Sequence, residues 1–190
     1  MRELLRTAGR PIVLIGLMGS GKSTVGRELS RRTGLSLLDM DAVIEEQVGL
    51  SIPDIFREKG EAHFRLLETA LLRYLEQGIA SGHGAHIIST GGGVVLRPEN
   101  REILRRMGLT VWLNVDLANL LLRTARAQNR PLLQVADREA TLRALLVERS
   151  PLYTQASHLR INSSEMKVPE VVNTILRYAQ KHFKRFARRG

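Results

Sequence analysis

Five short apolar runs recur along the chain, and the segments between them carry apolar residues at helical spacing. Strands that alternate with helices are typical of βαβ units, in which helices cover both faces of a parallel sheet. The pattern therefore predicts an α/β fold with three layers, α/β/α, around a five-stranded parallel sheet. The sequence contains no internal repeat and no low-complexity linker. The five predicted strands are Pro11–Ile15, Leu35–Leu38, His86–Ser89, Thr110–Val115 and His158–Ile161.

The segment GLMGSGKS at residues 16–23 directly follows the first predicted strand and fits the pattern G-x-x-x-x-G-K-[ST]. Its glycines can adopt positive φ and leave no side chain in the way, so successive backbone N–H groups can converge on phosphate oxygens. We expect a helix over Lys22–Thr33 whose N-terminus points at the same phosphates, with Lys22 reaching the β- and γ-phosphates and Ser23 binding Mg²⁺. The motif predicts a nucleoside triphosphate site. A glycine-rich turn without a chemical role is the alternative.

Length and composition indicate one soluble domain. With 190 residues, 43% of them hydrophobic, the chain can bury one core, and we expect a single domain over residues 1–190. No stretch approaches the roughly 20 apolar residues of a membrane span, and residues 1–10 lack the apolar centre of a signal peptide. We therefore expect a cytoplasmic protein with no membrane partner. The absence of cysteine excludes disulfides, a zinc–thiolate site and thiol catalysis.

The formal charge of +10 is compatible with nucleic acid, an acidic membrane surface or small anionic substrates as partners. Part of the charge lies in the basic C-terminal tail, residues 181–190, which extends a predicted helix whose apolar face includes Val171, Ile175 and Ala179. We interpret the tail as a solvated helix end, with an RNA or membrane contact as the alternative. Because aromatic residues make up only 4% of the chain, few side chains are available for base stacking, and we expect no nucleic-acid partner.

Two acids, Asp39 and Asp41, follow the second predicted strand. In an open parallel sheet, ligands bind beyond the carboxyl ends of the strands, which places these acids beside the phosphate-binding loop. If the backbone is still extended there, both side chains turn toward the same side. One acid can then hold Mg²⁺ or its waters while the other orients a substrate hydroxyl and accepts its proton. The alternative is that one or both simply cap a helix over Ala42–Val48.

Two further segments lie where ligands would bind. The glycines at residues 91–93 follow the third predicted strand, where backbone amides could approach a ligand closely; a flexible turn is the alternative. Arg130 precedes a proline between helices predicted over Asp116–Ala127 and Asp137–Glu148. Such a segment could close as a lid and bring positive charge to a transferred phosphoryl group, with a surface charge as the alternative.

Arg65 is a candidate for binding a carboxylate. Arg65 lies in a predicted amphipathic helix, and a planar guanidinium pairs with a carboxylate through two hydrogen bonds. The alternative is a surface arginine that pairs with Glu61 or Glu68. Arg149 is predicted to lie at a helix end, just before Pro151.

These motifs, in this order, resemble those of the shikimate kinase family, and the resemblance spans about residues 12–178. A phosphate-binding loop alone is typical of a whole superfamily, but its combination with the other motifs is specific. The resemblance implies a P-loop kinase of the nucleoside monophosphate kinase type, with a shikimate-binding segment at about residues 41–70 and a lid at about residues 124–138. The matching motifs are GLMGSGKST at residues 16–24, LLDMD at 37–41, FRLLE at 64–68, GGG at 91–93, RPLL at 130–133 and ERSPLY at 148–153.

The resemblance also implies roles for individual residues. Arg65 and Arg149 match the pair that clamps the carboxylate of shikimate, and Asp41 matches the acid that holds its hydroxyls. Ser23 matches a metal ligand, and Asp39 matches the acid that organises the metal through water. The implied catalytic residues are Asp41, Lys22 and Arg130, the implied ATP-binding residues are Gly19, Ser20, Gly21, Lys22, Ser23, Thr24, Arg123 and Arg130, and the implied shikimate-binding residues are Asp41, Arg65, Gly91, Gly92, Gly93 and Arg149.

By this resemblance, the reaction is transfer of the γ-phosphoryl group of ATP to the 3-hydroxyl of shikimate, in aromatic amino-acid (chorismate) biosynthesis. The implied cofactor is Mg²⁺, the implied partners are the substrates ATP and shikimate, and the implied oligomeric state is a monomer. A related small-molecule kinase, such as a gluconate kinase with another acceptor pocket, is the nearest alternative. An ATP-dependent nucleic-acid-binding protein that uses residues 181–190 is an alternative of another class.

Overall fold

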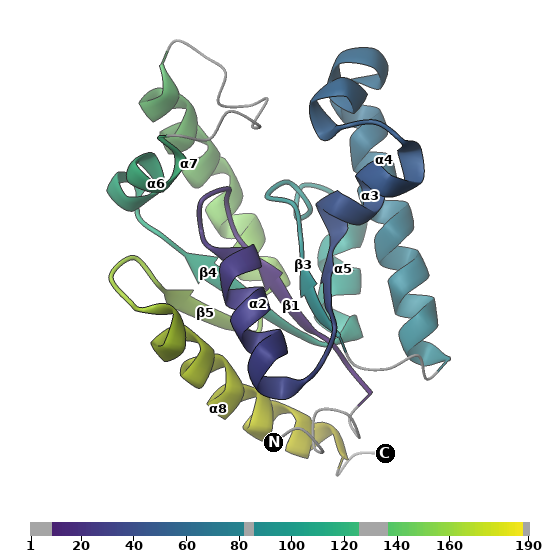
Figure 1. Cartoon of the computed structure of the whole chain (residues 1–190), viewed down its shortest axis with the longest axis vertical. Coiled ribbons are helices and arrows are strands. Elements are labelled where there is room, and N and C mark those ends of the chain that lie inside the picture. The colour runs from purple at the N-terminus through teal and green to yellow at the C-terminus, as the bar shows by residue number, and fades with distance from the viewer. Residues whose placement is uncertain (1–8, 82–85, 126–136, 188–190) are drawn as a thin grey trace.

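The computed structural model describes residues 9–81, 86–125 and 137–187, with side chains through Lys184. These residues form a five-stranded, all-parallel sheet between two layers of helices, as predicted (Figure 1). The strand order is β2-β3-β1-β4-β5, which places β1 at the centre. In chain order the elements are β1 (Ile12–Ile15), α2 (Lys22–Thr33), β2 (Leu37–Asp39), α3 (Met40–Val48), α4 (Ile52–Ala80), β3 (Ile87–Ser89), α5 (Pro98–Met107), β4 (Leu109–Asn114), α6 (Leu117–Thr124), α7 (Arg138–Ala156), β5 (Leu159–Asn162) and α8 (Val168–Ala187).

The central strand β1 is buried on both faces, as a parallel strand covered by helices must be. Its side chains alternate between two hydrophobic clusters. Val13 and Ile15 pack with residues of α3 to α7, and Ile12 and Leu14 pack with residues of α2 and α8. The two clusters are the two interfaces between the sheet and its helical layers, so the core is divided by the sheet itself.

The register of the sheet aligns the strand ends that the sequence marked as chemically informative. Asp39, at the end of β2, lies opposite Ser89, at the end of β3, and Ser89 also lies opposite Leu14 of β1. All three strands run in the same direction, so their carboxyl ends meet at one edge of the sheet. The phosphate-binding loop, the two acids and the three glycines therefore emerge side by side.

Three predicted helices have other boundaries in the structure. Helix α6 ends at Thr124 rather than at Ala127. Helix α3 begins at Met40 rather than Ala42, because the Asp39 side chain accepts a hydrogen bond from the Asp41 N–H and caps the helix. Helix α7 continues to Ala156 rather than ending at Glu148, although it contains Pro151.

The continuation of α7 through a proline has a physical reason. Proline leaves the carbonyl four residues earlier without its helical hydrogen bond, and here that residue is Val147, which is exposed to water. The turns beyond the proline bury Tyr153 and Ala156 in the core. Burial of these side chains offsets the cost of the missing hydrogen bond, so Arg149 lies inside the helix and not at its end.

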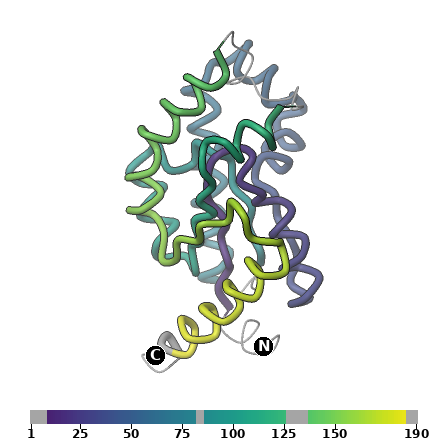
Figure 2. The backbone as a smooth tube through the Cα atoms, turned by 90° about the vertical axis from the view of Figure 1, so that its left-hand side faces the viewer, coloured from purple at the N-terminus to yellow at the C-terminus, as the bar shows by residue number. Residues whose placement is uncertain are grey.

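The basic tail is partly a core element. Helix α8 buries Val171, Ile175, Ala179 and Phe183 against the sheet, so its apolar face extends past residue 181. Figure 1 and Figure 2 both place the last turns of α8 at the end of the molecule opposite the first turns of α4. None of the helices in the described ranges is both long and apolar enough to cross a membrane.

Replacing Phe183 by Ala should lower the free energy of unfolding by about 3–5 kcal/mol, because the substitution leaves a cavity beneath the sheet. Urea unfolding followed by circular dichroism measures the change. Lys184→Ala, at the adjacent exposed position, is the matched control and should change the free energy by no more than about 0.5 kcal/mol. Equal midpoints for the two variants would show that the last turns of α8 do not contribute to the core.

Candidate active site

A cavity of about 340 Å³ opens at the carboxyl ends of β1, β2 and β3. It brings together most residues that the sequence marked for nucleotide, metal and proton transfer chemistry. Ser89 and Thr90, at the end of β3, also line it and were not predicted as site residues. The lining residues are Gly19, Gly21, Lys22, Ser23, Thr24, Asp39, Asp41, Ser89, Thr90, Gly92 and Arg123.

The phosphate-binding loop has the backbone that its glycines allow. Gly16, Gly19 and Gly21 have φ values of 144°, 80° and 89°, as predicted, and these values are strained for any other residue. Gly21 occupies the N-cap of α2 without a side chain to satisfy the first-turn N–H groups. The Lys22 Nζ donates to the carbonyls of Gly16 and Leu17, at 2.8 and 2.9 Å. A helix N-terminus with a lysine beside it is a site for anionic groups such as phosphates.

The two acids lie at the same edge but not for the predicted reason. Asp39 is extended, whereas Asp41 already belongs to α3, so the assumption of an extended backbone through both was wrong. Asp39 caps α3 with one oxygen and accepts from the Ser23 hydroxyl with the other, at 3.1 Å. The capping role and the site role therefore coexist in one carboxylate. The Ser23 hydroxyl also lies 3.4 Å from that of Ser89, which surrounds it with oxygen atoms.

Residues 91–93, the glycine turn, must be glycines because site side chains pack directly onto their backbone. A Cβ at Gly91 would lie 2.7 Å from Asp41 Oδ1 and 2.7 Å from Glu68 Oε1. A Cβ at Gly93 would overlap the guanidinium of Arg65, and one at Gly92 would lie 3.3 Å from the Met18 backbone nitrogen. The backbone of the glycine turn is therefore in direct contact with Asp41, Glu68 and Arg65. The sequence had not indicated this contact.

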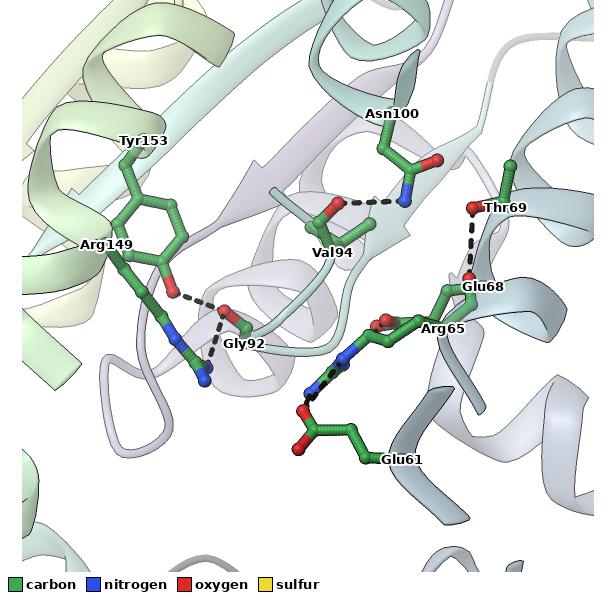
Figure 3. A network of polar contacts seen from close by, with 9 residues as sticks. All are labelled: Glu61, Arg65, Glu68, Thr69, Gly92, Val94, Asn100, Arg149 and Tyr153. Atoms are coloured by element: carbon green, nitrogen blue, oxygen red, sulfur yellow. Dashed lines mark hydrogen bonds and ion pairs between the residues drawn. The ribbon is translucent and has the colours of Figure 1, made fainter. Parts of the chain in front are cut away.

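Arg65 is a buried residue of α4, 8% exposed, so the alternative of a surface arginine is wrong. Arg65 nonetheless pairs with both Glu61 and Glu68. The Nη2 and Nη1 atoms donate to Glu61 and Glu68, at 2.5 and 2.6 Å, from positions one helical turn away (Figure 3). Although burial alone would lower the pKa of Arg65, the carboxylates of Glu68 and Glu61 raise it, so the guanidinium stays charged.

Arg149 approaches the glycine turn from α7, on the side opposite Arg65 (Figure 3). Only 4% of it is exposed, and its Nη1 donates to the Gly92 carbonyl at 3.4 Å. Glu148 is the acid paired with it, through a distance of 3.8 Å between Nε and Oε2. Two guanidinium groups from distant parts of the chain thus lie on either side of one turn, next to the cavity that Asp41 lines.

Glu68 is a site residue that the sequence interpretation treated only as a partner for Arg65. It is completely buried, and its Oε1 makes no hydrogen bond within the described part of the chain. Burial raises the pKa of Glu68 to about 7, Arg65 opposes this rise, and the negative charge of Asp41 adds to it. The signal was present in the motif FRLLE, because spacing of three residues places Arg65 and Glu68 on one helix face.

Arg123 lies on the other side of the phosphate-binding loop. Its Nη2 donates to the carbonyls of Ser163 and Ser164, at 3.3 and 2.8 Å. Arg130 and most of the predicted lid, residues 124–138, lie outside the described residues. Beside Arg123, a second hollow of about 220 Å³ is lined by Ser20, Gly21, Thr24, Val25, Arg123, Ser163, Met166, Val168 and Val171.

Comparison with known proteins points to one family. The family model for shikimate kinase matches residues 18–180. A shikimate kinase of Xanthomonas euvesicatoria pv. vesicatoria is 44% identical over 169 residues, which cover 88% of this chain and 91% of that protein. One of Bordetella pertussis is 41% identical over 175 residues, which cover 92% and 81%. The solved structure of shikimate kinase from Acinetobacter baumannii in complex with shikimate has a TM-score of 0.85 and 39% identity, over 91% of this chain and 94% of that chain.

Glu68→Gln should flatten the pH dependence of stability between about pH 4.5 and 7. In this range the folded protein keeps a proton on Glu68 that the unfolded chain has released, because the folded pKa is raised from 4.5 to about 7. The resulting stabilisation is complete below pH 4.5 and is lost as the pH rises through 7. Thermal melts across this pH range measure the change in stability. Glu58→Gln, at an exposed position of α4, is the control. If Glu68→Gln kept the pH slope of the wild type, the folded pKa of Glu68 would not be raised.

Proposed function

The chain belongs to the shikimate kinase family, and we propose from this premise how its residues divide the reaction between them. The protein is an enzyme that uses ATP to phosphorylate shikimate in the shikimate pathway. One observation supports the assignment of residues below more than any other. Arg65 and Arg149 flank the glycine turn, residues 91–93, next to a cavity lined by both the phosphate-binding loop and Asp41.

We assign the acceptor site to Arg65, Arg149, Asp41 and the glycine turn. Shikimate is a ring that carries one carboxylate and three hydroxyls, so its binding requires cationic donors at one end and an acceptor at the other. Two buried guanidinium groups supply paired donors for the carboxylate, and burial strengthens these hydrogen bonds. The side chain of Asp41 packs against the same glycine turn as that of Arg65, where it can accept a hydrogen bond from a ring hydroxyl.

We assign ATP to the phosphate-binding loop and to the hollow beside Arg123. Gly19, Gly21, Lys22, Ser23 and Thr24 line the cavity, and Lys22 can leave the two loop carbonyls for the β- and γ-phosphates. The adenine would occupy the second hollow, where Arg123 is held by two backbone carbonyls. A guanidinium held in this way can stack on a base.

Mg²⁺ is the proposed cofactor, and the donor set fits it. The Ser23 hydroxyl and an Asp39 carboxylate oxygen are neighbouring hard oxygen atoms beside the phosphate site. The described residues contain no cluster of three or more acids and histidines that could hold a metal ion alone, so phosphates and water would complete the coordination. When bound, the cation neutralises negative charge on the transferred group. Asp39 would hold it through water, and Ser23 directly.

The proposed chemistry of Asp41 is to orient the 3-hydroxyl of shikimate and accept its proton as the oxygen attacks the γ-phosphorus. The backbone N–H of Asp41 donates to Asp39, so the acid at the acceptor and the acid at the metal site are fixed relative to each other. Lys22 stabilises the negative charge of the phosphoryl group in flight. Arg130, outside the described residues, is the proposed second cation for this charge.

We further propose that residues 1–190 form one kinase domain that works as a monomer in the cytoplasm, with residues 124–138 as its lid. All described parts of the site come from one chain, through β1, α2, α3, α4, the glycine turn and α7. A second copy is therefore not needed to complete them. ATP is abundant in the cytoplasm, which supports the location.

A coupled ADP-release assay that offers shikimate, quinate and gluconate in parallel tests the acceptor. We expect turnover chiefly with shikimate. Preferential turnover of gluconate would assign the chain to a related kinase activity and would overturn the acceptor site proposed here.

Arg65→Ala and Arg149→Ala should each raise the KM for shikimate by at least about 30-fold, since a buried charged hydrogen-bond partner is worth 2 kcal/mol or more. The KM for ATP should change less than about threefold, because neither guanidinium lines the cavity at the phosphate-binding loop. Steady-state kinetics measure both constants. Arg73→Ala, an exposed arginine of the same helix as Arg65, is the control and should behave as wild type. An unchanged KM for shikimate in both site variants would remove the carboxylate clamp from the mechanism.

A further inference from the structure

Tyr153 is a fully buried residue of α7 whose hydroxyl points at the glycine turn (Figure 3). The hydroxyl donates to the Gly92 carbonyl at 2.5 Å. The ring stacks on Trp112 of β4, with centroids 5.6 Å apart and an angle of 26° between the planes. A side chain held on both sides in this way can fix the position of the carbonyl that it contacts.

The Gly92 carbonyl is shared between Tyr153 and Arg149. The bond from Arg149 is the weaker one, because its Nη1 lies 3.4 Å from the oxygen. The Nε of Arg149 is buried and makes no hydrogen bond to any described residue. Apart from a contact with the Tyr153 hydroxyl, the guanidinium of Arg149 therefore has only this long hydrogen bond to Gly92 and an unbonded Nε among the described residues. Tyr153 satisfies the carbonyl through a short hydrogen bond.

Within the described ranges, the side chains other than Tyr153 and Arg149 that hydrogen-bond near this turn do so at its edges. The Thr90 hydroxyl donates to the Leu14 carbonyl at 3.0 Å, before the three glycines. The Asn100 amide donates to the Val94 carbonyl at 2.9 Å, after them. Tyr153 contacts the middle of the turn, between the positions where Asp41 and Arg65 rest.

We propose that Tyr153 is a positioning residue for shikimate binding, which rests on the acceptor site proposed above. Its hydroxyl holds the Gly92 carbonyl, so that Arg149 is available to the substrate carboxylate. Without the hydroxyl, the carbonyl would draw on Arg149 as its remaining donor. The substrate would then meet an arginine whose donors are already engaged.

Tyr153→Phe tests this role, because it removes the hydroxyl and keeps the ring on Trp112. We expect the KM for shikimate to rise about tenfold, while kcat and the KM for ATP stay within about twofold. An unchanged KM for shikimate in a folded variant would overturn the proposal. Tyr153→Leu also lacks the hydroxyl and should show the same selective effect, so the test does not depend on one variant folding.

Tyr178→Phe is the matched control. The Tyr178 hydroxyl also donates to a backbone carbonyl, that of His158 at 3.0 Å, but from α8 and away from the acceptor site. It should lower the melting temperature without changing the KM for shikimate. If Tyr153→Phe behaved in the same way, its hydroxyl would be structural only.

A double-variant cycle separates this proposal from the clamp on which it rests. If Tyr153 acts through Arg149, the KM for shikimate of Arg149→Ala with Tyr153→Phe should equal that of Arg149→Ala alone. Independent, multiplying effects would overturn the coupling. An Arg149→Ala variant with wild-type KM would instead show that the clamp is wrong, whatever Tyr153→Phe does.

Discussion

The close approach of side chains to the backbone of residues 91–93 is the constraint on which this site depends. A turn built of glycine can carry two acids and a guanidinium at distances that any Cβ would prevent. The same turn leads out of β3, so its position is set by the register of the sheet and not by a mobile loop. The pocket is therefore an extension of the core, in which the packing of α4 and α7 against the sheet determines where the charged groups lie.

The two guanidinium groups beside this turn differ in how closely the protein pairs them with carboxylates. Arg65 has two carboxylates within hydrogen-bond distance, and one of them, Glu68, is completely buried. Arg149 is as deeply buried, but its paired carboxylate, on Glu148, lies 3.8 Å away. A buried guanidinium with weak protein partners favours an anionic ligand, since the ligand restores hydrogen bonds lost on leaving water. This difference supports the proposal that the site binds a carboxylate although several acids lie nearby.

The sequence predicts the parts of this structure that depend on local pattern. The alternation of apolar runs and helical segments predicted all five strands, and the loop at residues 16–23 predicted the helix from Lys22 to Thr33 without error. Tertiary packing determined what was missed. Burial of Tyr153 carries α7 through Pro151, and this continuation places Tyr153 one turn beyond Arg149, on the same face. Tyr153 was overlooked because its importance arises from burial, which a spacing pattern does not report. Glu68 was interpreted only as a partner of Arg65, although the spacing in FRLLE places both on one helix face.

The hydrophobic cluster beneath α2 and α8 contains residues from both the first strand and the last helix of the described chain. Ile12 and Leu14, in the first strand, share it with Ile175 and Phe183, in the last helix. During synthesis on a ribosome, α2 can cover part of this face of β1 early, but the cluster stays incomplete until α8 has left the exit tunnel. Emergence of α8, and not that of the phosphate-binding loop, then sets the earliest moment at which the nascent enzyme can complete this part of its core.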